Sequence, residues 1–377
     1  MSAGAAAATG RRGPVGVAIV GAGVISREYL GNLTGFPDVR VLGVADQDVP
    51  RAQEAARQYG VAVAGDVGAI LDLPDVEIVV NLTTPAAHAE VALAALRAGK
   101  HVYGEKPLTL DPVAGRELLA EAAQRGLLVG NAPDTFLGPG LQAARRAVDS
   151  GLIGAPVAVT MAMRAGGPEA WHPDPEFLYQ PGAGPLFDLG PYYLTALVAL
   201  FGPVRRVAGS ARQARSRRTI GSGPRAGTSF AVEVPTHVTA LLDLAAGPAA
   251  SATFSFDSTV RRRMFEVTGA EGTLAVPDPN TFGGPLLVVT AAGDGQPRDL
   301  PVGPVVAGRG LGVLDLARAV RSGVPHRASG ALALHVLESM AAIIESARRG
   351  EFVEVTSSPT LPEALPTDWD PRAATLL

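Results

Sequence analysis

The chain contains no cysteine in its 377 residues, which excludes disulfide bonds, thiolate nucleophiles and cysteine-based metal sites. Charged residues are also few, at 18 % against 47 % hydrophobic residues. The net charge of −4 supplies no broad cationic field, so neither a nucleic acid nor a membrane is an expected partner. No uninterrupted apolar run reaches the roughly 18 residues that a membrane span needs. We therefore expect a globular cytoplasmic protein, long enough for two domains.

Residues 1–13 are rich in alanine and glycine and contain Arg11-Arg12, as a twin-arginine export signal does. The apolar run that follows, Val15–Val20, passes straight into a glycine turn without a separate apolar segment or cleavage site. We therefore predict a disordered leader over 1–13.

The first half of the chain begins with a nucleotide-binding pattern. Val15–Val20 is continuously apolar, which is typical of a strand buried on both faces. The glycines of the turn Gly21–Ser26 allow backbone N–H groups to approach a pyrophosphate at the start of a predicted helix, Ser26–Leu33. Ser26 replaces the usual third glycine, which weakens the motif without cancelling it, because serine is small.

An acidic residue follows the second predicted strand, Val39–Ala45. Asp46 is placed to accept hydrogen bonds from both ribose hydroxyls and to repel a 2′-phosphate, which favours NAD over NADP. The alternative is that Asp46 and Asp48 form a capping cluster for the helix Pro50–Tyr59. The nearby Arg51 leaves NADP as the less favoured cofactor.

Strands and helices continue to alternate, which predicts a parallel, doubly wound Rossmann sheet with right-handed crossovers. The further predicted elements are Val76–Leu82, Ala86–Arg97, Lys100–Gly104, Pro112–Arg125 and Leu127–Gly130. Glu105-Lys106-Pro107 directly follows an apolar strand, and ligands bind at the carboxyl ends of such strands. Lys106 is therefore a candidate for chemistry, and a surface ion pair with Glu105 is the alternative.

The second half contains strands with few helices between them, which predicts an α/β domain with a large, open, mostly antiparallel sheet. The predicted strands are Val157–Met163, Val204–Gln213, Thr236–Ala245, Ala249–Asp257, Met264–Gly269 and Leu286–Thr290. The predicted helices are Leu141–Ser150, Leu311–Ser322 and Ala331–Arg348. We place the domains at 14–133 and 134–357, and a surface-wrapping tail at 358–377.

A segment rich in glycine and proline leads into the apolar helical run Tyr193–Phe201. Asp188 and Tyr192 are one helical turn apart, so they share one face of a helix. The alternative is that Asp188 caps the helix and the tyrosines belong to the core.

Two polar clusters in the second half of the chain could suggest binding sites, and both also have structural interpretations. No metal is expected at His172, Asp174 and Glu176, because alternating prolines extend the chain there and there is no second histidine cluster. A basic region is either a solvated or subunit-facing surface or a site for a phosphate-bearing substrate such as a nucleotide sugar. Its members are Arg205, Arg206, Arg212, Arg215, Arg217, Arg218 and Arg225.

Taken in order, these pieces resemble the GFO/IDH/MocA family of glucose-fructose oxidoreductase, inositol dehydrogenase and MocA, from about Val15 to Arg349. The motifs are Gly21–Ser26, Asp46, Thr84-Pro85 with His88, Ala98–Val102, Glu105–Pro107 and Gly182–Tyr192. The resemblance implies a Rossmann domain followed by an open-sheet domain, with nicotinamide and substrate meeting between them.

The resemblance also implies roles for particular residues. Lys106 matches the catalytic lysine of the family and Asp188 its aspartate, whereas many members have histidine at the position of Tyr192. Glucose-fructose oxidoreductase and the dihydrodiol dehydrogenases have tyrosine there. The implied cofactor contacts are Gly21, Gly23, Val24, Ile25, Asp46, Thr83, Thr84, Pro85, His88, Glu105, Lys106 and Pro107. The nominated substrate contacts are Arg164, Trp171, His172 and Tyr193.

The leading hypothesis is hydride transfer between NAD and a secondary alcohol or ketone of a sugar, cyclitol or glycoside. Tyr192 acts as general base, Lys106 orients the oxygen and depresses the pKa of the tyrosine, and Asp188 holds the group in place. One alternative is a redox-neutral hydrolase or lyase that oxidises its substrate transiently, and another is a non-catalytic NAD-binding sensor. We expect a homodimer or homotetramer formed through the C-terminal sheet.

Overall fold

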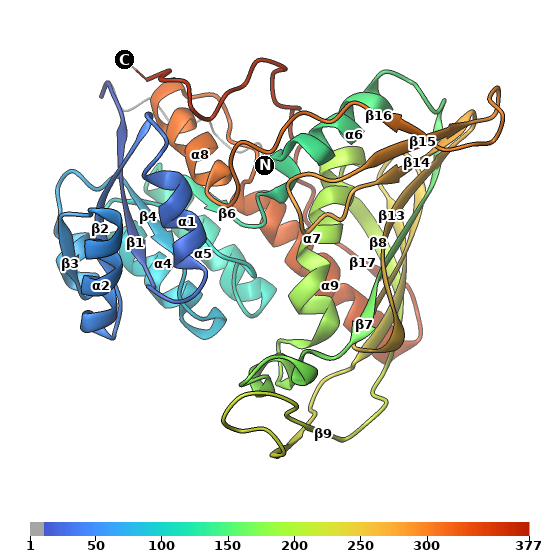
Figure 1. The fold of residues 1–377 in the computed structure, drawn as a ribbon, viewed down its shortest axis with the longest axis horizontal. Coiled ribbons are helices and arrows are strands. Elements are labelled where there is room, and N and C mark those ends of the chain that lie inside the picture. Colours follow the sequence, from blue (N-terminus) through green and yellow to red (C-terminus); the bar gives the residue numbers. More distant parts are fainter. Residues whose placement is uncertain (1–10, 377) are drawn as a thin grey trace. The chain divides into compact units, whose positions relative to one another are not determined.

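The structure is a computed structural model that describes residues 11–376, so most of the predicted leader lies outside it. The chain divides into two compact units, whose elements are labelled in Figure 1. Unit 1 comprises Met1–Gly138, Val305–Leu334 and Leu365–Leu377. Unit 2 comprises Pro139–Pro304 and His335–Ala364.

Unit 1 is built on a six-stranded parallel sheet with the strand order β3-β2-β1-β4-β5-β6, which confirms the doubly wound prediction. The strands are β1 (Val15–Val20), β2 (Val39–Ala45), β3 (Val63–Gly65), β4 (Ile78–Asn81), β5 (His101–Gly104) and β6 (Val129–Asn131). The helices are α1 (Ser26–Leu33), α2 (Val49–Tyr59), α3 (Val67–Leu71), α4 (His88–Arg97), α5 (Pro112–Gln124) and α8 (Leu311–Ser322). All six residues of β1 are buried, as expected for a strand covered on both faces.

Unit 1 also incorporates segments that were assigned to the second domain and to the tail, so the predicted boundaries are corrected. Helix α8 packs against β5 and β6. The buried carboxylate of Asp38 accepts hydrogen bonds from Arg318 Nε at 2.8 Å and from the backbone N–H of Thr375 at 2.8 Å. Burial alone raises the pKa of Asp38, but these hydrogen bonds outweigh it and hold the pKa below its usual value. Local sequence carries no signal for such pairing.

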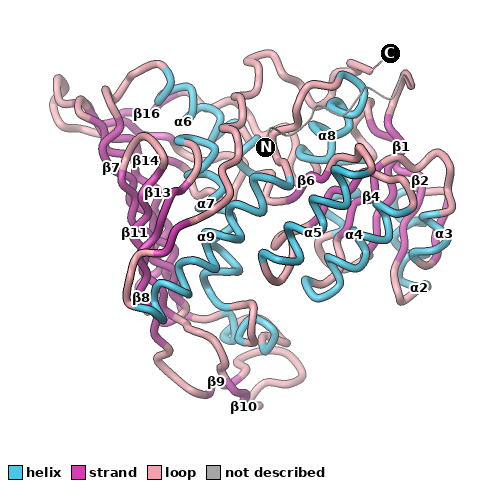
Figure 2. Tube along the Cα trace, turned by 180° about the vertical axis from the view of Figure 1, so that it is seen from behind, coloured by secondary structure: helices cyan, strands magenta, loops and turns pink. Residues whose placement is uncertain are grey.

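Unit 2 contains a nine-stranded sheet in which β7 and β12 are parallel and the other pairs are antiparallel, as predicted. The strands of this sheet are β7 (Pro156–Gly166), β8 (Val204–Arg212), β11 (His237–Leu244), β12 (Ala249–Ser255), β13 (Asp257–Gly269), β14 (Gly272–Val276), β15 (Leu286–Thr290), β16 (Arg298–Leu300) and β17 (Val353–Glu354). Helices α6 (Pro139–Asp149), α7 (Gly184–Phe201) and α9 (Gly330–Arg349) lie along one face of the sheet in both Figure 1 and Figure 2.

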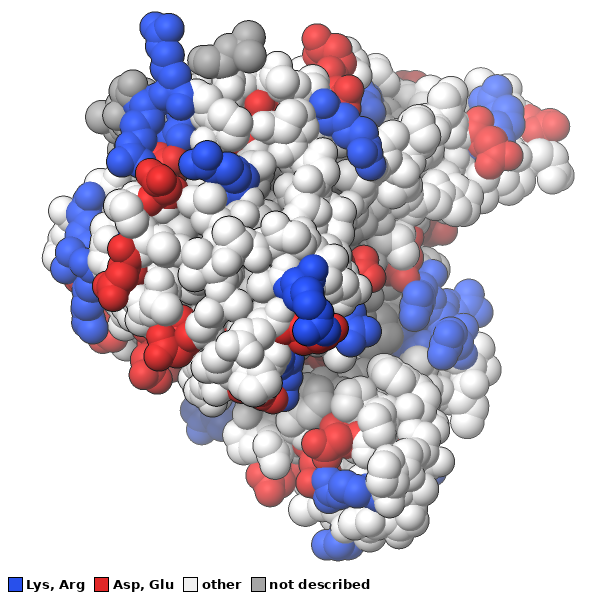
Figure 3. All heavy atoms as spheres, turned by 60° about the vertical axis from the view of Figure 1, so that its left-hand side comes forward, with Lys and Arg blue, Asp and Glu red and all other residues white. Residues whose placement is uncertain are grey.

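Helices α7 and α9 are long and apolar enough to cross a membrane by length and composition alone. However, 78 % of the most apolar window of α7 and 67 % of that of α9 is buried within the protein, as in core helices. Figure 3 shows basic and acidic side chains interspersed over much of one face of the molecule, without a continuous field of one sign.

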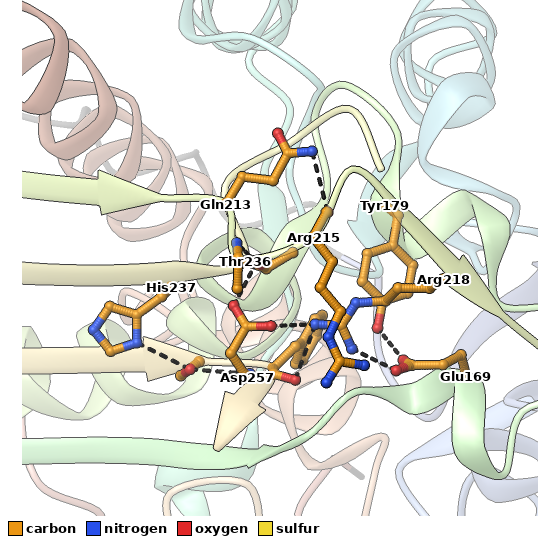
Figure 4. A network of polar contacts seen from close by, with 11 residues as sticks. Glu169, Tyr179, Gln213, Arg215, Arg218, Thr236, His237 and Asp257 are labelled. Atoms are coloured by element: carbon orange, nitrogen blue, oxygen red, sulfur yellow. Dashed lines mark hydrogen bonds and ion pairs between the residues drawn. The ribbon is translucent and has the colours of Figure 1, made fainter. Parts of the chain in front are cut away.

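A buried arginine connects three segments of unit 2 that are distant in the sequence, as Figure 4 shows. Arg218, on the short strand β9 (Arg217–Thr219), donates to Glu169 and to Asp257, and its side chain is only 4 % exposed. Tyr179 donates to Glu169 as well, while Thr236 donates to Asp257 at 2.5 Å. Burial, together with the hydrogen bond to Glu169, raises the pKa of Tyr179, so the phenol remains a donor. The network fixes β9 and its partner β10 (Ser229–Ala231) to the rest of unit 2.

Several other arginines of the basic region also pair with carboxylates of the protein. Arg225 binds Asp174 at 2.5 Å and Glu176 at 2.6 Å, and Arg206 binds Asp243 at 2.6 Å. For Arg206, Arg218 and Arg225, these pairs favour a structural role over phosphate recognition. No group of three or more histidine, aspartate or glutamate side chains suited to a metal ion occurs within residues 11–376.

We predict that Arg218→Met lowers the free energy of unfolding by about 3–5 kcal/mol, because it leaves two largely buried carboxylates without their cation. The matched control is Arg217→Met, which removes an exposed neighbouring arginine and costs less than about 1 kcal/mol. Urea unfolding of both variants, followed by circular dichroism, measures the difference. Equal unfolding midpoints would show that the buried network does not stabilise unit 2.

Candidate active site

The last residues of neighbouring strands in unit 1 lie in one row across the sheet. Val20 pairs with Ala45 on one side and with Asn81 on the other. Asn81 pairs with Gly104, which in turn pairs with Asn131. The segments that follow these residues therefore emerge at the same edge, where open parallel sheets bind ligands. They include the glycine turn, the acid after β2, the threonine segment after β4 and the Glu-Lys-Pro segment after β5.

The glycine turn between β1 and α1 has room for a ligand. Gly21 has a φ of +103°, and a Cβ there would lie 2.6 Å from the carbonyl of Leu82, so only glycine fits. A Cβ on Gly23 would meet no atom within 4 Å. The hydroxyl of the buried Ser26 donates to the Gly23 carbonyl at 2.7 Å, which fixes the turn. The open space at Gly23 and the 88 % exposure of Val24 fit a dinucleotide on the backbone of the turn.

Asp46 faces the glycine turn and does not cap the next helix. Its Oδ2 accepts a hydrogen bond from the N–H of Ala22 at 2.7 Å. Asp48 is the residue that caps α2, because its Oδ1 accepts the N–H of Arg51 at 3.2 Å. The Arg51 guanidinium lies 3.7 Å from the Asp46 carboxylate. This arrangement fits recognition of a ribose by Asp46 and fits a 2′-phosphate poorly.

His88 lies between two loops with its side chain buried, so the ring is not open to a cofactor as predicted. The side chain is buried, with Nδ1 2.7 Å from the carbonyl of Pro107 and Nε2 3.0 Å from the carbonyl of Thr83. Burial lowers the pKa of His88. Both ring nitrogens are thus engaged with backbone. Thr84 and Pro85 lie at the start of the 3-10 helix Pro85–Ala87 that precedes α4; both are exposed and stay predicted cofactor contacts.

Glu105 is buried directly after β5, and both of its carboxylate oxygens accept hydrogen bonds within the protein. Glu105 Oε1 accepts a hydrogen bond from the Tyr29 hydroxyl at 2.8 Å, and Oε2 accepts the backbone N–H of Lys106 at 3.1 Å. The backbone N–H of Glu105 donates to the Asn81 carbonyl at 2.9 Å. Lys106 itself is half-buried directly beyond the end of β5. Its backbone is therefore fixed on the ligand-binding edge.

In unit 2, helix α7 contains the other two predicted catalytic residues. It begins at Gly184, well before the predicted start at Tyr193. Gly184 has a φ of +89°, and a Cβ there would lie 3.0 Å from the carbonyl of Pro235. Asp188 is therefore inside the helix and is not its cap, and Tyr192 follows one turn later on the same face.

Tyr193 is a core residue, and its nomination as a substrate contact is wrong. The side chain is fully buried and its ring packs against Phe254 and Phe265. Its hydroxyl donates to Asp278 at 3.3 Å. Burial and this carboxylate raise the pKa of Tyr193, so the phenol stays protonated.

The other three nominated substrate contacts remain predictions. Arg164 lies half-buried on β7, and its Nε is buried without a hydrogen-bond partner in the part of the chain that is described. Trp171 is 64 % exposed, and its ring lies edge-on to that of His172. His172 contacts the ring of the exposed Phe177 in the same way.

Three buried residues near the Glu-Lys-Pro segment were not nominated from the sequence. Asn81 is a polar residue at the end of an apolar strand, and Asp46 was nominated from the same kind of position. The sequence therefore contained a signal for Asn81. The sequence pattern around Tyr29 is typical of a core aromatic residue on an amphipathic helix. Asp134 accepts hydrogen bonds from the N–H groups of Gly310 and Gly312, far along the chain, and burial raises its pKa to about 6.

Comparison with known proteins finds the same family for both parts of the chain. Residues 15–132 match the GFO/IDH/MocA model described as an oxidoreductase family with an NAD-binding Rossmann fold. Residues 141–275 match the GFO/IDH/MocA C-terminal domain.

Among curated relatives, trans-1,2-dihydrobenzene-1,2-diol dehydrogenase of Bos taurus is 32 % identical over 49 % of this chain and 55 % of its own length. A dTDP-3,4-didehydro-2,6-dideoxy-alpha-D-glucose 3-reductase of Streptomyces antibioticus is 30 % identical over 54 % of this chain and 62 % of its own length. The chain thus spans little more than half the length of these relatives.

Among solved structures, levoglucosan dehydrogenase in complex with NADH and L-sorbose has a TM-score of 0.78 at 22 % identity, over 91 % of this chain and 99 % of that one. At this identity the likeness shows the fold. Since both family models match in the expected order, the chain belongs to the GFO/IDH/MocA family of oxidoreductases, and its residues 15–132 form an NAD-binding domain.

Proposed function

We propose that the protein transfers a hydride between NAD and a secondary alcohol or ketone of a sugar, cyclitol or glycoside. The activities named for its relatives and for the similar structure support this class, because they involve a cyclic diol, a keto sugar and levoglucosan. Lys106, Asp188 and Tyr192 form the proposed acid–base group.

The observation that carries the proposal is the scarcity of lysine. Of the 32 basic residues only Lys100 and Lys106 are lysines. Lys100 is buried and its Nζ donates to the carbonyl of Leu73 at 2.8 Å, which is a structural role. The ammonium of lysine is a compact point charge with three donors on a flexible stem, whereas the guanidinium of arginine is a planar fork. A lysine on the ligand-binding edge of a chain that otherwise uses arginine supports a chemical role for Lys106.

In the proposed mechanism, NAD would be held at the glycine turn and Asp46 and would accept the hydride. Tyr192 takes the proton of the substrate hydroxyl, and the oxygen forms its second bond to carbon as the hydride leaves that carbon. Lys106 donates a hydrogen bond to the same oxygen, where negative charge develops. Asp188, one helical turn before Tyr192, holds the reacting group in place.

We predict that Lys106→Met lowers kcat by roughly 10²- to 10⁴-fold while NAD affinity changes only a fewfold, because the lost contact strengthens in the transition state. Lys100→Met is the matched control and keeps the wild-type kcat. The measurement is NADH formation with the best substrate from a panel of sugars, inositols, levoglucosan and cyclic diols. If Lys106→Met retains more than about a tenth of the wild-type kcat, Lys106 has no catalytic role. Product formation without net NADH would favour the redox-neutral alternative.

The position of Asp46 predicts cofactor preference. NAD is expected to bind at least tenfold more tightly than NADP, which corresponds to about 1.4 kcal/mol. Asp46→Ser reduces the difference between the affinities for NAD and NADP, since it removes the charge that repels a 2′-phosphate. Fluorescence titration with NADH and NADPH measures both affinities, and tighter NADPH binding by the wild type would contradict the assignment.

We also propose that the uncovered face of the unit 2 sheet binds a second copy of the chain. Strand pairing places a row of half-exposed or exposed residues across five strands, namely Ala208, Leu241, Ser251, Thr160 and Glu266. No helix within residues 11–376 lies over this face in Figure 1 or Figure 2. Mostly short side chains leave the face flat, which suits close contact between two sheets.

We predict that Leu241→Arg dissociates the oligomer, because it places a charge within the proposed interface. Leu241 is 55 % exposed. Val113 on α5 has the same exposure, so Val113→Arg is a matched control that leaves assembly unchanged. Sedimentation velocity measures the mass of each protein, and a monomeric wild type would rule out the proposal.

A further inference from the structure

We infer that Tyr29 is a positioning residue for Lys106 and acts through the carboxylate of Glu105. This inference rests on the proposed function of Lys106. Tyr29 is fully buried on α1, and its hydroxyl donates to Glu105 Oε1 at 2.8 Å. Glu105 in turn accepts the backbone N–H of Lys106 on its other oxygen at 3.1 Å. One side-chain hydroxyl is thus two hydrogen bonds away from the backbone of the lysine.

The Glu105 carboxylate has little freedom to find another partner for the oxygen that Tyr29 binds. Glu105 is only 9 % exposed, so water does not readily replace a lost donor. Its backbone is fixed from both sides, since its N–H donates to the Asn81 carbonyl at 2.9 Å and its carbonyl accepts from Asn131 Nδ2 at 3.0 Å. Without Tyr29, the remaining freedom is rotation of the carboxylate, which changes its hydrogen bond to Lys106.

The phenol of Tyr29 is a permanent donor in this arrangement. Burial raises its pKa well above the usual value, and the charge of Glu105 raises it further. The phenol therefore keeps its proton and remains a hydrogen-bond donor well above neutral pH.

Tyr29 also ties Lys106 to the cofactor side of unit 1. It lies one turn after Ser26, whose hydroxyl binds the Gly23 carbonyl of the glycine turn at 2.7 Å. The same short helix therefore orders the turn that fits the dinucleotide and holds the segment of the catalytic lysine. Positioning through a rigid helix predicts a loss of rate rather than of cofactor affinity, because the glycine turn itself is unchanged.

The chain offers a matched control in Tyr103. It is also fully buried, and its ring centroid lies 6.4 Å from that of Tyr29. Unlike Tyr29, its hydroxyl has no hydrogen-bond partner within residues 11–376. Tyr29→Phe and Tyr103→Phe thus remove the same atom from the same part of the core, but only the first removes a contact to Glu105.

The first experiment measures rate and affinity with the full chain. We expect Tyr29→Phe to lower kcat about 10- to 100-fold, with the Kd of NAD changed less than about threefold. Tyr103→Phe is expected to stay within about twofold of the wild-type kcat. Thermal unfolding of both variants checks that they are folded. If Tyr29→Phe does not fold, Glu105→Gln weakens the same acceptor and takes its place.

The second experiment observes Lys106 directly and needs no substrate. Reductive methylation with ¹³C-formaldehyde labels the chain at only two lysines and the amino terminus. We expect the Lys106 signal to move or split in Tyr29→Phe and to remain unchanged in Tyr103→Phe, with Lys100 as an internal reference. A role of Tyr29 in stability alone would leave this signal unchanged in the folded protein.

The outcomes separate this inference from the proposed function. If Lys106→Met abolishes activity while Tyr29→Phe matches Tyr103→Phe in both experiments, the positioning role is overturned and the proposed function stands. If Lys106→Met stays active, the catalytic role proposed for Lys106 fails. In that case the ¹³C comparison alone tests whether Tyr29 positions Lys106. An unchanged Lys106 signal in Tyr29→Phe overturns the positioning role of Tyr29.

Discussion

Parallel hydrogen bonding between β1, β4 and β5 is the constraint on which the cofactor half of the site depends. Because the side-chain period of a strand is two, a slip of one residue would turn every side chain to the opposite face. It would also displace the segments after the strands, since Val20, Asn81 and Gly104 stand in one row. The glycine turn and the Glu-Lys-Pro segment meet at one edge only in this register.

Much of this half was predictable because its signals are local. Continuous apolar runs gave the parallel strands, and strand ends gave the positions of Gly21, Asp46 and Lys106. The antiparallel character of the second sheet also followed from the order of its segments. Helix α7 was recognised only in part, because Pro185 and Pro191 lie inside its first turns and weaken the helical pattern.

What the sequence did not predict are contacts between distant segments. Arg218 seemed one of many arginines, and only the fold places it between Glu169 and Asp257. Tyr192 and Tyr193 are neighbours in the chain and both are buried, and only the fold shows that Tyr193 packs against Phe254 and Phe265. Likewise, His88 seemed suited to a ligand until both of its nitrogens were found on backbone carbonyls.

The composition of unit 1 from three separate stretches has a consequence for protein synthesis. Asp38 and Thr375 form a hydrogen bond although 337 residues separate them in the chain. A ribosome releases the strands of this sheet early, but Asp38 has no bond to Thr375 until Thr375 has emerged. The nucleotide-binding unit is therefore completed after the sheet of unit 2 has been synthesised, although it begins first.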